Sequence, residues 1–522
     1  MDDKGQDIAA AVAARKAEEE SLRAAQSGKG NDGCITSKFI NDCLDSNERG
    51  DGALFAALHR GRFVIDKNSS QWYLWTGHYW KMDTMDETYR LIEEVSVKYL
   101  GAADNITPQI SKAQEEGKEE LKESLKRHRA AFYVRAKKLR SVKGAQNCLT
   151  WAHRVEQGLG VHGEEFDRNP WLLAVSNGVV DLHTGRFREG RPEDMLTKAS
   201  PHAWTGIDTP APAWERFLND VFTGDNALID YVRRLFGYGI TGIVREHIFA
   251  VLHGEGRNGK GTLVETLRYV LGDAARPIQS ELLLDQKAYR SSSGPSPDIM
   301  GLKGLRIAFA TETDEGRRFS SSKVKWLSGG DTLIGRNPHD KHETAFRPTH
   351  LLCLLTNHLP HAPGDEFSFW QRLHLIPFKV KFVDEPKAPD EKQKIKDLQE
   401  SLEGEASGIL AWLVRGCVEW QKQGLNPPLI VRASTEDYRL SEDLLSSFLT
   451  DRCQETRDER VQFKLIYDAF VIWFVQNIGD EKFCPKKKKF SQLMEKRFEK
   501  KKVGGHIWFN GLSMSDFENG EG

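Results

Sequence analysis

The period of the hydrophobic pattern changes several times along this chain. Residues 247–253 (HIFAVLH) form an almost continuous apolar run, which is typical of a strand buried on both faces. The apolar residues of TLVETLRYVL have helical spacing, and the glycine-rich segment GEGRNGKGT joins this predicted helix to the strand. Two more apolar runs, LRIAFA and THLLCLLT, predict further buried strands. The pattern therefore predicts an α/β core that begins with a strand, a glycine-rich loop and a helix.

The regions around this core have different patterns. Alternating aromatic residues between Gly52 and Asp83 predict a β-hairpin, for which core packing is favoured over base stacking. A highly charged stretch from Glu87 to about Leu159 predicts helices, and proline and small residues over 204–213 indicate a boundary. We therefore expect a polar arm, disordered or helical, over 1–50; an α+β N-terminal domain over 51–205; the core over 214–383; a helical region over 393–440; and a basic module over 446–515.

Composition narrows the functional class. The chain has 522 residues, a formal net charge of -2 and seven cysteines without a C-x-x-C pair, so a zinc site and a disulfide framework are disfavoured. No apolar run approaches the ~20 residues that span a bilayer, which predicts a protein of a reducing cytoplasm with no membrane partner. The net charge hides one local excess, because residues 482–502 hold ten Lys or Arg against two Glu.

The glycine-rich loop predicts nucleotide binding. Glycines let backbone N–H groups close around phosphates, and the following helix adds its positive N-terminal end. Lys260 supplies a full charge to the β- and γ-phosphates, so ATP and Mg2+ are the expected ligands. Gly261 occupies the position where a Mg2+-binding Ser or Thr is usual, so either Thr262 takes that role or water holds the metal. The alternative is a glycine-rich turn without a ligand. The predicted cradle consists of Gly254, Glu255, Gly256, Arg257, Asn258, Gly259, Lys260, Gly261 and Thr262.

Three polar residues after later strands complete the expected catalytic set. Glu312, about fifty residues after the loop, follows a mostly apolar strand and is assigned to the Mg2+ shell and the attacking water, with Asp314 and Glu315 as weaker candidates. Asn357 ends the next strand and is expected to orient water near a γ-phosphate. Arg372 follows an aromatic pair, where an arginine could reach a neighbouring subunit's nucleotide.

Two segments are candidates for DNA contact. Lys341 and His342 lie at the tip of a predicted hairpin, and backbone contacts to nucleic acid require cations. The C-terminal segment has helical apolar spacing followed by a strand-like VGGHIWF, which predicts a winged-helix-like module. A solvated turn and a solvated lysine-rich tail are the respective alternatives. The basic residues singled out there are Lys486, Lys487, Lys488 and Lys489.

The series GEGRNGKGT, ATETDE, KWLSGGD, LLTNHLP and WQRLHLIPF resembles the superfamily 3 helicase core of phage and plasmid primase-helicases, relatives of the poxvirus primase-helicase. NPWLLAVSNGVVDLHTG resembles the domain that precedes that core. The resemblance implies an AAA+-like P-loop core with a helical collar, assembled as a hexameric ring that translocates along DNA with ATP. It also implies a Walker B role for Glu312, a sensor role for Asn357 and an arginine-finger role for Arg372. Lys325 and Ser328 to Asp331 match an additional family motif.

The resemblance predicts an ATP-dependent DNA helicase that acts in the replication of a phage, prophage or plasmid, in the cytoplasm of a bacterial host or a virus-infected cell. The mostly polar residues before Gly52 are too few for a primase domain, so a separate primase or polymerase is the expected partner. Two alternatives stay open. One is a DNA-binding ATPase that does not unwind, and the other is an origin initiator whose main task is site-specific binding.

Overall fold

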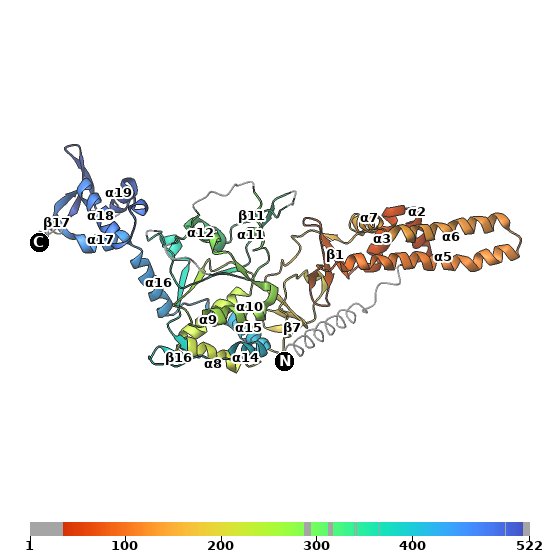
Figure 1. Cartoon of the computed structure of the whole chain (residues 1–522), viewed down its shortest axis with the longest axis horizontal. Helices are drawn as coiled ribbons and strands as arrows, with labels where there is room; N and C mark the ends of the chain where they lie inside the picture. Colours follow the sequence, from red (N-terminus) through yellow and green to blue (C-terminus); the bar gives the residue numbers. More distant parts are fainter. Residues whose placement is uncertain are drawn as a thin grey trace.

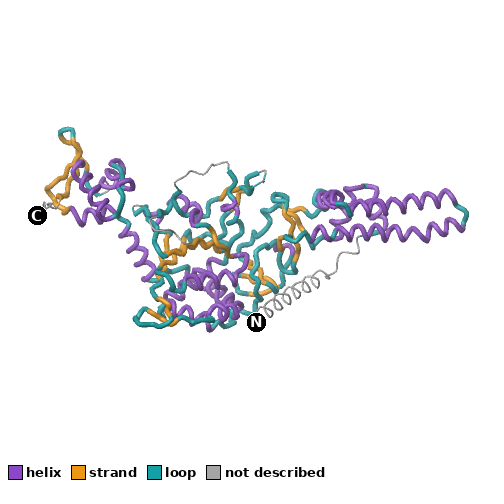
Figure 2. Tube along the Cα trace, viewed as in Figure 1, coloured by secondary structure: helices purple, strands orange, loops and turns teal. Residues whose placement is uncertain are grey.

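The computed structural model describes residues 35–286, 294–311, 317–338, 340, 342–364, 366–495 and 497–514. The described chain is elongated, with an N-terminal domain at one end, a central α/β domain and a C-terminal module at the other end (Figure 1). Strands concentrate in the middle of the central domain and helices lie against them (Figure 2). None of the helices in these residues is long and apolar enough to cross a membrane.

The N-terminal domain combines a helical hairpin with a small sheet. The sheet order is β3-β2-β1-β4, and β1, β2 and β3 form a three-stranded meander where the sequence pattern predicts an aromatic hairpin. Trp80 is buried, and Trp72 packs edge-on against Phe55, so these aromatic residues serve the core. The elements are α2 (Ser37–Asp45), α3 (Asn47–His59), β1 (Phe63–Asp66), β2 (Gln71–Trp75), β3 (Trp80–Met82), α4 (Glu87–Arg90), α5 (Ile92–Glu115), α6 (Glu119–Leu139), α7 (Val142–Ala152) and β4 (Gly160–Val161).

The N-terminal domain begins before residue 51, where the sequence pattern had placed its boundary. Residues 1–34 of the expected arm lie outside the described residues. Its last part forms α2 and the start of α3, and Cys43 and Leu44 are buried in the domain core. Gly50 explains the tight fit, since a Cβ there would lie 1.8 Å from the Cys43 carbonyl oxygen. The helices were hard to assign to the domain because their apolar residues are few.

A second small sheet links this domain to the centre. It has the order β5-β6-β7, and its turns fall at Asn177-Gly178 and Thr184-Gly185. Arg306, from the central domain, donates to the carbonyl oxygens of Pro170 at 2.8 Å and Leu172 at 3.1 Å, which ties the two parts together. The elements are β5 (Leu172–Val175), β6 (Gly178–Asp181), β7 (Arg186–Arg188) and the 3-10 helix η2 (Pro192–Asp194).

The central domain is built on a five-stranded parallel sheet of order β14-β8-β13-β10-β9. Alternate residues of its strands enter two different hydrophobic clusters, one on each face, which explains the continuous apolar runs in the sequence. All these strands run in the same direction, so their carboxyl ends meet at one edge. The strands are β8 (Phe249–His253), β9 (Ala275–Ile278), β10 (Ile307–Thr311), β13 (Leu351–Thr356) and β14 (Leu373–Pro377).

Helices cover both faces of this sheet. On one face α9 and α15 cross closely, because Gly237 and Gly416 leave no room for a Cβ between the two backbones. That face carries α8 (Pro212–Val221), α9 (Asn226–Gly239), α10 (Lys260–Leu271), α14 (Leu398–Gly404) and α15 (Ala406–Gln423). The remaining elements are η3 (Gly272–Ala274), η4 (Ser280–Leu282), α11 (Pro297–Met300), α12 (Ser321–Ser328), β11 (Leu333–Gly335), β12 (Thr344–Phe346), α13 (Phe367–Trp370), β15 (Lys381–Val383), β16 (Glu391–Gln393) and α16 (Leu429–Ser441).

The C-terminal module follows α16 and has its own core. At its centre Phe470 stacks on Phe490, and Phe448 packs edge-on against Phe470. A three-stranded sheet of order β17-β19-β18 covers one side of this core. The chain order is helix, strand, two helices and two strands (Figure 1). The elements are α17 (Leu444–Arg452), β17 (Cys453–Gln462), α18 (Phe463–Asn477), η5 (Glu481–Phe483), α19 (Lys487–Glu495), β18 (Lys500–Val503) and β19 (His506–Met514).

Candidate nucleotide-binding site

The glycine-rich loop joins β8 to α10 at the carboxyl edge of the central sheet, as the sequence pattern predicts. Two of its residues have left-handed backbone conformations, Arg257 at φ 62° and Gly259 at φ 87°. A side chain at position 259 would meet Val221 at 2.8 Å, so glycine is required there for both space and conformation. These turns let the chain double back directly before the first turn of α10.

The loop offers free donors to a ligand. Among the described residues, no acceptor is found for the backbone N–H groups of residues 255–259. The N–H groups of the first turn of a helix also lack intrahelical partners. Such a cluster of donors at a helix N-terminus favours an anion, and its chemistry fits the phosphates of a nucleotide.

Lys260 lies in the middle of this cluster. Its side chain is 6% exposed, and its ammonium donates to the Gly254 carbonyl, to the Glu255 carbonyl at 3.4 Å and to Asn357 Oδ1 at 3.0 Å. Burial lowers the pKa of Lys260 to about 8, because the low-dielectric surroundings disfavour the charged form. All three partners are acceptors, so the ammonium is held in place and presented to the loop.

Asn258 connects the loop to the segment that follows β14. Its side chain is 4% exposed, and its amide donates to the Phe378 carbonyl at 3.4 Å. The Phe382 N–H donates to the Arg257 carbonyl at 2.7 Å, so the segment after β14 backs the loop at two points. Sequence reasoning missed this backing, since nothing in KVKFV distinguishes it from an ordinary strand.

Strand order brings Asn357 to the lysine. β13 lies directly beside β8, with Thr356 opposite His253, so Asn357 follows at the level of the loop. β10 is the next strand along, and Thr311 ends it opposite Leu355. Glu312 follows Thr311 in the sequence, but it lies outside the described residues, as do Asp314 and Glu315. The carboxyl edge therefore carries the loop, Asn357 and the strand end that leads to Glu312.

The expected metal ligand on α10 is harder to place. Gly261 is exposed and a Cβ there would meet nothing within 4 Å, whereas Thr262 is half-buried. Residues two apart on a helix do not share a face, so Thr262 lies about 200° around the helix from Lys260. Within the described residues, no group of three or more His, Cys, Asp or Glu could hold a metal ion. Thr262 and Glu312 thus stay predictions as metal ligands.

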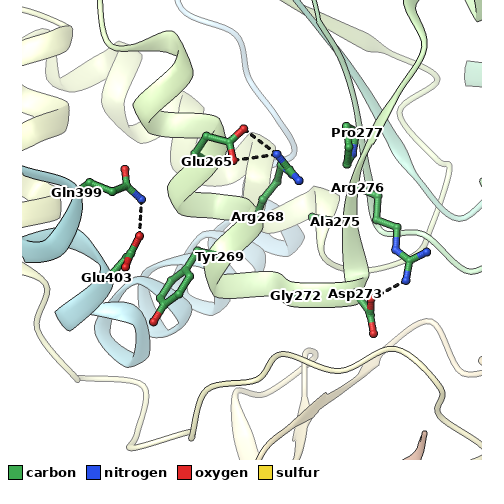
Figure 3. A pocket seen from close by; sticks show the side chains of 10 residues that line it. All are labelled: Glu265, Arg268, Tyr269, Gly272, Asp273, Ala275, Arg276, Pro277, Gln399 and Glu403. Atoms are coloured by element: carbon green, nitrogen blue, oxygen red, sulfur yellow. Dashed lines mark hydrogen bonds and ion pairs between the residues drawn. The ribbon is translucent and has the colours of Figure 1, made fainter. Parts of the chain in front are cut away.

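A separate hollow lies at the other end of α10, away from the loop. It has a volume of about 500 Å³, and its charged side chains largely pair with one another, as Glu265 does with Arg268 at 2.7 Å and Asp273 with Arg276 at 2.5 Å (Figure 3). Gln399 donates to Glu403 at 2.8 Å along α14, on one wall of the same hollow. These internal pairs leave few groups for a ligand, so the loop is the better nucleotide site.

Comparison with known proteins gives this architecture a family. Residues 52–223 match the family described as D5 N terminal like. A protein of Acanthamoeba polyphaga mimivirus named "Putative helicase" is 29% identical over 348 residues, which covers 64% of this chain and 36% of that protein. Residues 52–223 thus form a D5 N terminal like domain, and the chain as a whole resembles the D5-like primase-helicases.

Other relatives of this D5-like chain come from further large DNA viruses. A "Putative helicase" of Invertebrate iridescent virus 3 is 23% identical and covers 89% of this chain and 54% of its own length. A "Putative primase" of African swine fever virus is 24% identical and covers 60% of this chain and 34% of its own length. The chain thus spans between about a third and about half of these relatives. The C terminal region of NrS-1 resembles it at 13% identity and a TM-score of 0.35, covering 59% of this chain and 78% of that one.

Arg372 of the D5-like chain lies far from its own loop. It directly precedes β14, whose Leu373 pairs with Phe249 at the amino end of β8, and its backbone carbonyl accepts from the Phe249 N–H at 2.8 Å. Arg372 is therefore level with Ile248, which precedes Gly254 by six residues. At 3.3 Å per residue of strand, the two levels are about 20 Å apart. The guanidinium donates to the Ser368 carbonyl at 2.9 Å, and Nε has no partner in the described chain. Arg372 therefore cannot reach the nucleotide of its own loop.

The residues of the additional family motif gather on and after α12. Lys325 pairs with Glu366 at 3.1 Å, and the Ser328 side chain donates to the Val324 carbonyl at 2.6 Å. Gly330 follows with a left-handed φ of 80°. These contacts give the motif a defined shape, and no function of it follows from them.

The predicted hairpin is present as β11 and β12, paired from Leu333 with Phe346 to Gly335 with Thr344. Near its tip Asp340 accepts from the Asn337 side chain at 3.0 Å, and His342 is exposed. Lys341 lies outside the described residues. In the C-terminal module, Lys486 precedes α19, and Lys487, Lys488 and Lys489 lie in its first turn, all of them exposed. The ammonium of Lys487 also lies 5.5 Å from the centre of the Tyr467 ring.

Proposed function

We propose that this chain is an ATP-dependent DNA helicase that acts as a ring-shaped oligomer in the replication of a phage, plasmid or other DNA element. The observation that carries the proposal is the meeting of Lys260, Asn357 and the free loop amides at one edge of the sheet. The likeness to the viral relatives supports a helicase as well, since two of those reported above bear the name helicase. The proposed core is an AAA+-like P-loop ATPase.

In this proposal the loop of residues 254–259 wraps the ATP phosphates with its amides. Lys260 moves from its carbonyl partners to the β- and γ-phosphates, and Asn357 orients the attacking water. Glu312 polarises that water. Mg2+ would neutralise developing charge on the phosphates, held by Glu312 and by Thr262 directly or through water.

The position of Arg372 supports the proposed ring. Phosphoryl transfer gains roughly 10³ or more in rate from an arginine on the γ-phosphate, and about 20 Å separate this arginine from its own loop. A neighbouring copy of the chain would bring its loop to Arg372. The site is then complete only between two subunits, which is why the proposal includes an oligomer and favours a hexamer.

The C-terminal module supports a DNA-loading role. Its helices and three-stranded sheet follow the order of a winged helix, and α19 presents its lysines at an exposed N-terminal turn. The same observation favours a second candidate, an origin initiator or DNA-binding ATPase without processive unwinding. Strand displacement on a forked duplex separates helicase from ATPase, and sequence dependence of affinity at fixed salt separates an initiator from both.

Two substitutions test the ATPase site. Lys260→Ala should abolish nucleotide binding, because it removes the only full positive charge among residues 258–262. Glu312→Gln should leave nucleotide binding intact and stop turnover, because it removes the group that polarises water. Lys422→Ala, an exposed lysine at the end of α15, is the matched control and should change neither. ATPase rates equal to the wild type in both site variants would overturn the proposal.

A further inference from the structure

A second large cavity lies between the N-terminal domain and the base of the β11–β12 hairpin. Its volume is about 540 Å³, within the range of sites that hold small ligands. The N-terminal side contributes Asp66 and Tyr73 from β1 and β2, and the loop of residues 163–168. The central domain contributes residues 303–304 before β10, and residues 345–347 at the end of β12. No step of the proposed ATPase chemistry uses this cavity.

The cavity is remote from the nucleotide loop. Lys303 precedes β10, and Thr349 precedes β13, so this wall lies at the amino edge of the sheet. The loop and Asn357 lie at the carboxyl edge, at the opposite ends of the strands. A ligand here would therefore leave the ATP site open.

Two of the three acidic side chains that line the cavity already accept hydrogen bonds from the chain. Asp66 accepts from the Asn68 N–H and from the Ser69 hydroxyl, both at 2.8 Å. Asp167 accepts from the Thr197 N–H at 2.8 Å and from its hydroxyl at 2.5 Å. Asp66 is thus satisfied within its own turn and Asp167 by a residue from a distant segment, and neither forms a close ion pair with the cations opposite. Glu164, the third acid of the wall, is exposed.

The basic residues of the wall, by contrast, are available. The side chains of Lys198, Lys303 and Arg347 form no close ion pair or hydrogen bond with the described part of the chain, although Asp167 attracts Lys198 at longer range. Arg168 donates from Nε to the Glu164 carbonyl at 2.7 Å, so its two terminal nitrogens can still donate to a ligand. Lys198 and Lys303 are half-buried, and burial lowers the pKa of Lys198, so an anion at this place would stabilise the charged lysine. Unpaired cations facing a cavity favour an anionic ligand.

Aromatic side chains line the same cavity as these cations. Tyr73 and Phe166 pack with ring centres 4.7 Å apart, and both line the cavity. Phe346, the last residue of β12, contributes a third half-exposed ring. Proteins hold single strands with cations and aromatic faces together, since cations contact phosphates and rings stack on bases.

We infer that this cavity is a second binding site for single-stranded DNA, contacting phosphates through Lys303 and Arg347 and a base through Tyr73, Phe166 or Phe346. The inference rests on the proposed function for its choice of DNA as the ligand. The site adjoins the hairpin whose tip is the other proposed DNA contact, about 17 Å away along β12. A strand released from the tip would be held at the hairpin base.

The test is equilibrium binding of fluorescent oligothymidine to the full-length chain without nucleotide, over a series of salt concentrations. The double variant Lys303→Ala and Arg347→Ala should bind about tenfold more weakly, and its salt slope should fall by about 1.4, since each lost phosphate contact on a single strand removes about 0.7. The control removes two exposed cations elsewhere, Lys143→Ala and Arg154→Ala, and should keep wild-type affinity. DNA-free ATPase should match the wild type in both.

Further arms identify the ligand. Oligothymidine with 5-iodouracil should cross-link to a peptide that contains Tyr73, Phe166 or Phe346. Unchanged affinity and salt slope in the double variant would overturn the inference. Two other results would overturn the inference. One is that the double variant loses as much affinity for duplex DNA as for oligothymidine. The other is that free thymidine monophosphate displaces oligothymidine at the concentration at which the monophosphate itself binds.

This experiment separates the inference from the proposed function. Binding is measured without ATP and can be repeated in the Lys260→Ala background, so a failed ATPase test does not affect it. Loss of oligothymidine binding in the double variant together with wild-type turnover in Lys260→Ala would support the cavity and reject the ATPase. Intact binding in the double variant with no turnover in Lys260→Ala would do the reverse.

Discussion

At the residue scale, Lys260 combines two opposing requirements. Its ammonium must be free to meet phosphates, yet without a ligand it is buried and held by two carbonyls and Asn357. Burial lowers the pKa of Lys260 to about 8, well below the ordinary value of a lysine. The negative charge of ATP would raise that pKa again, so nucleotide binding and protonation of Lys260 are linked.

The linkage gives a pH-dependent affinity. Below about pH 8 the lysine is already charged, and affinity for a non-hydrolysable ATP analogue should be constant with pH. Above pH 8 binding must take up a proton, so affinity should fall by up to about tenfold per pH unit. Titration calorimetry in buffers of different ionisation enthalpy would measure both the affinity and the proton uptake.

Lys260→Arg is the control for this titration. An arginine is charged at every pH used, so its affinity, though lower, should not vary with pH. A wild-type affinity that stays constant up to pH 9.5 would show that Lys260 is not the titrating group.

At the scale of elements, the β11–β12 hairpin has a well-anchored base. Leu333 is buried in the core cluster that includes Val324 and Leu327 of α12, so the strands are fixed where they leave the domain. The contact from Asn337 to Asp340 shapes the approach to the tip. A fixed base with polar residues at the tip suits a hairpin that contacts a DNA strand during translocation. This is the role we propose for Lys341 and His342.

Substitution at the tip should uncouple DNA from ATP hydrolysis. Lys341→Ala should keep the DNA-free ATPase rate, because the tip takes no part in the nucleotide site. It should lose stimulation by single-stranded DNA and unwinding of a forked duplex, because it removes a phosphate contact. ATPase assays with and without DNA, and strand displacement, would measure this, with Lys422→Ala as the control. Full DNA stimulation in Lys341→Ala would assign the tip to another role.

The C-terminal module offers a second test at this scale. Glu442, at the end of α16, accepts from the Ala362 N–H at 2.9 Å, so a truncation should retain it to leave the central domain intact. Ending the chain after Asp443 should preserve ATPase and weaken DNA binding, with a smaller salt slope. Replacing Lys486, Lys487, Lys488 and Lys489 by alanine in the full chain should reproduce most of that loss. Unchanged duplex affinity and salt slope in both proteins would leave these lysines as a solvated surface.

At the scale of the whole molecule, the position of Arg372 connects one subunit to the next. It lies at the amino edge of the sheet while the loop lies at the carboxyl edge, so no motion of the side chain alone brings them together. If Arg372 contributes to catalysis, it acts on a neighbour's nucleotide. Ring assembly would then be a requirement for turnover.

Mixing two inactive variants tests this requirement. Arg372→Ala subunits retain an intact loop, and Lys260→Ala subunits retain an intact arginine, so mixed oligomers would contain some complete interfaces. ATPase activity should reappear on mixing and vary with the ratio of the two proteins. Native mass spectrometry would verify that the subunits have mixed. Mixed oligomers without activity at any ratio would limit Arg372 to its own subunit or to packing.

The sequence by itself determined the local chemistry of this protein. Glycine at position 259 and the apolar run before it predicted the strand, loop and helix, because backbone conformation and burial depend on neighbouring residues. Alternating residues likewise predicted the β1–β2 hairpin, and two short apolar stretches around HDKHE predicted the β11–β12 hairpin. The family resemblance was confirmed by the matches with the viral relatives. The assigned roles of Glu312, Thr262 and Lys341 stay predictions.

Only the tertiary structure decided which of these residues meet. The order of strands places β13 beside β8, so that Asn357 contacts Lys260 across 97 positions of sequence. The same sheet separates Arg372 from the loop, although WQRLHLIPF gives no sign of either edge. The cavity with Lys303 and Arg347 was invisible in the sequence, because its wall combines short segments of two domains. Such encounters depend on how distant segments pack, and no local pattern encodes them.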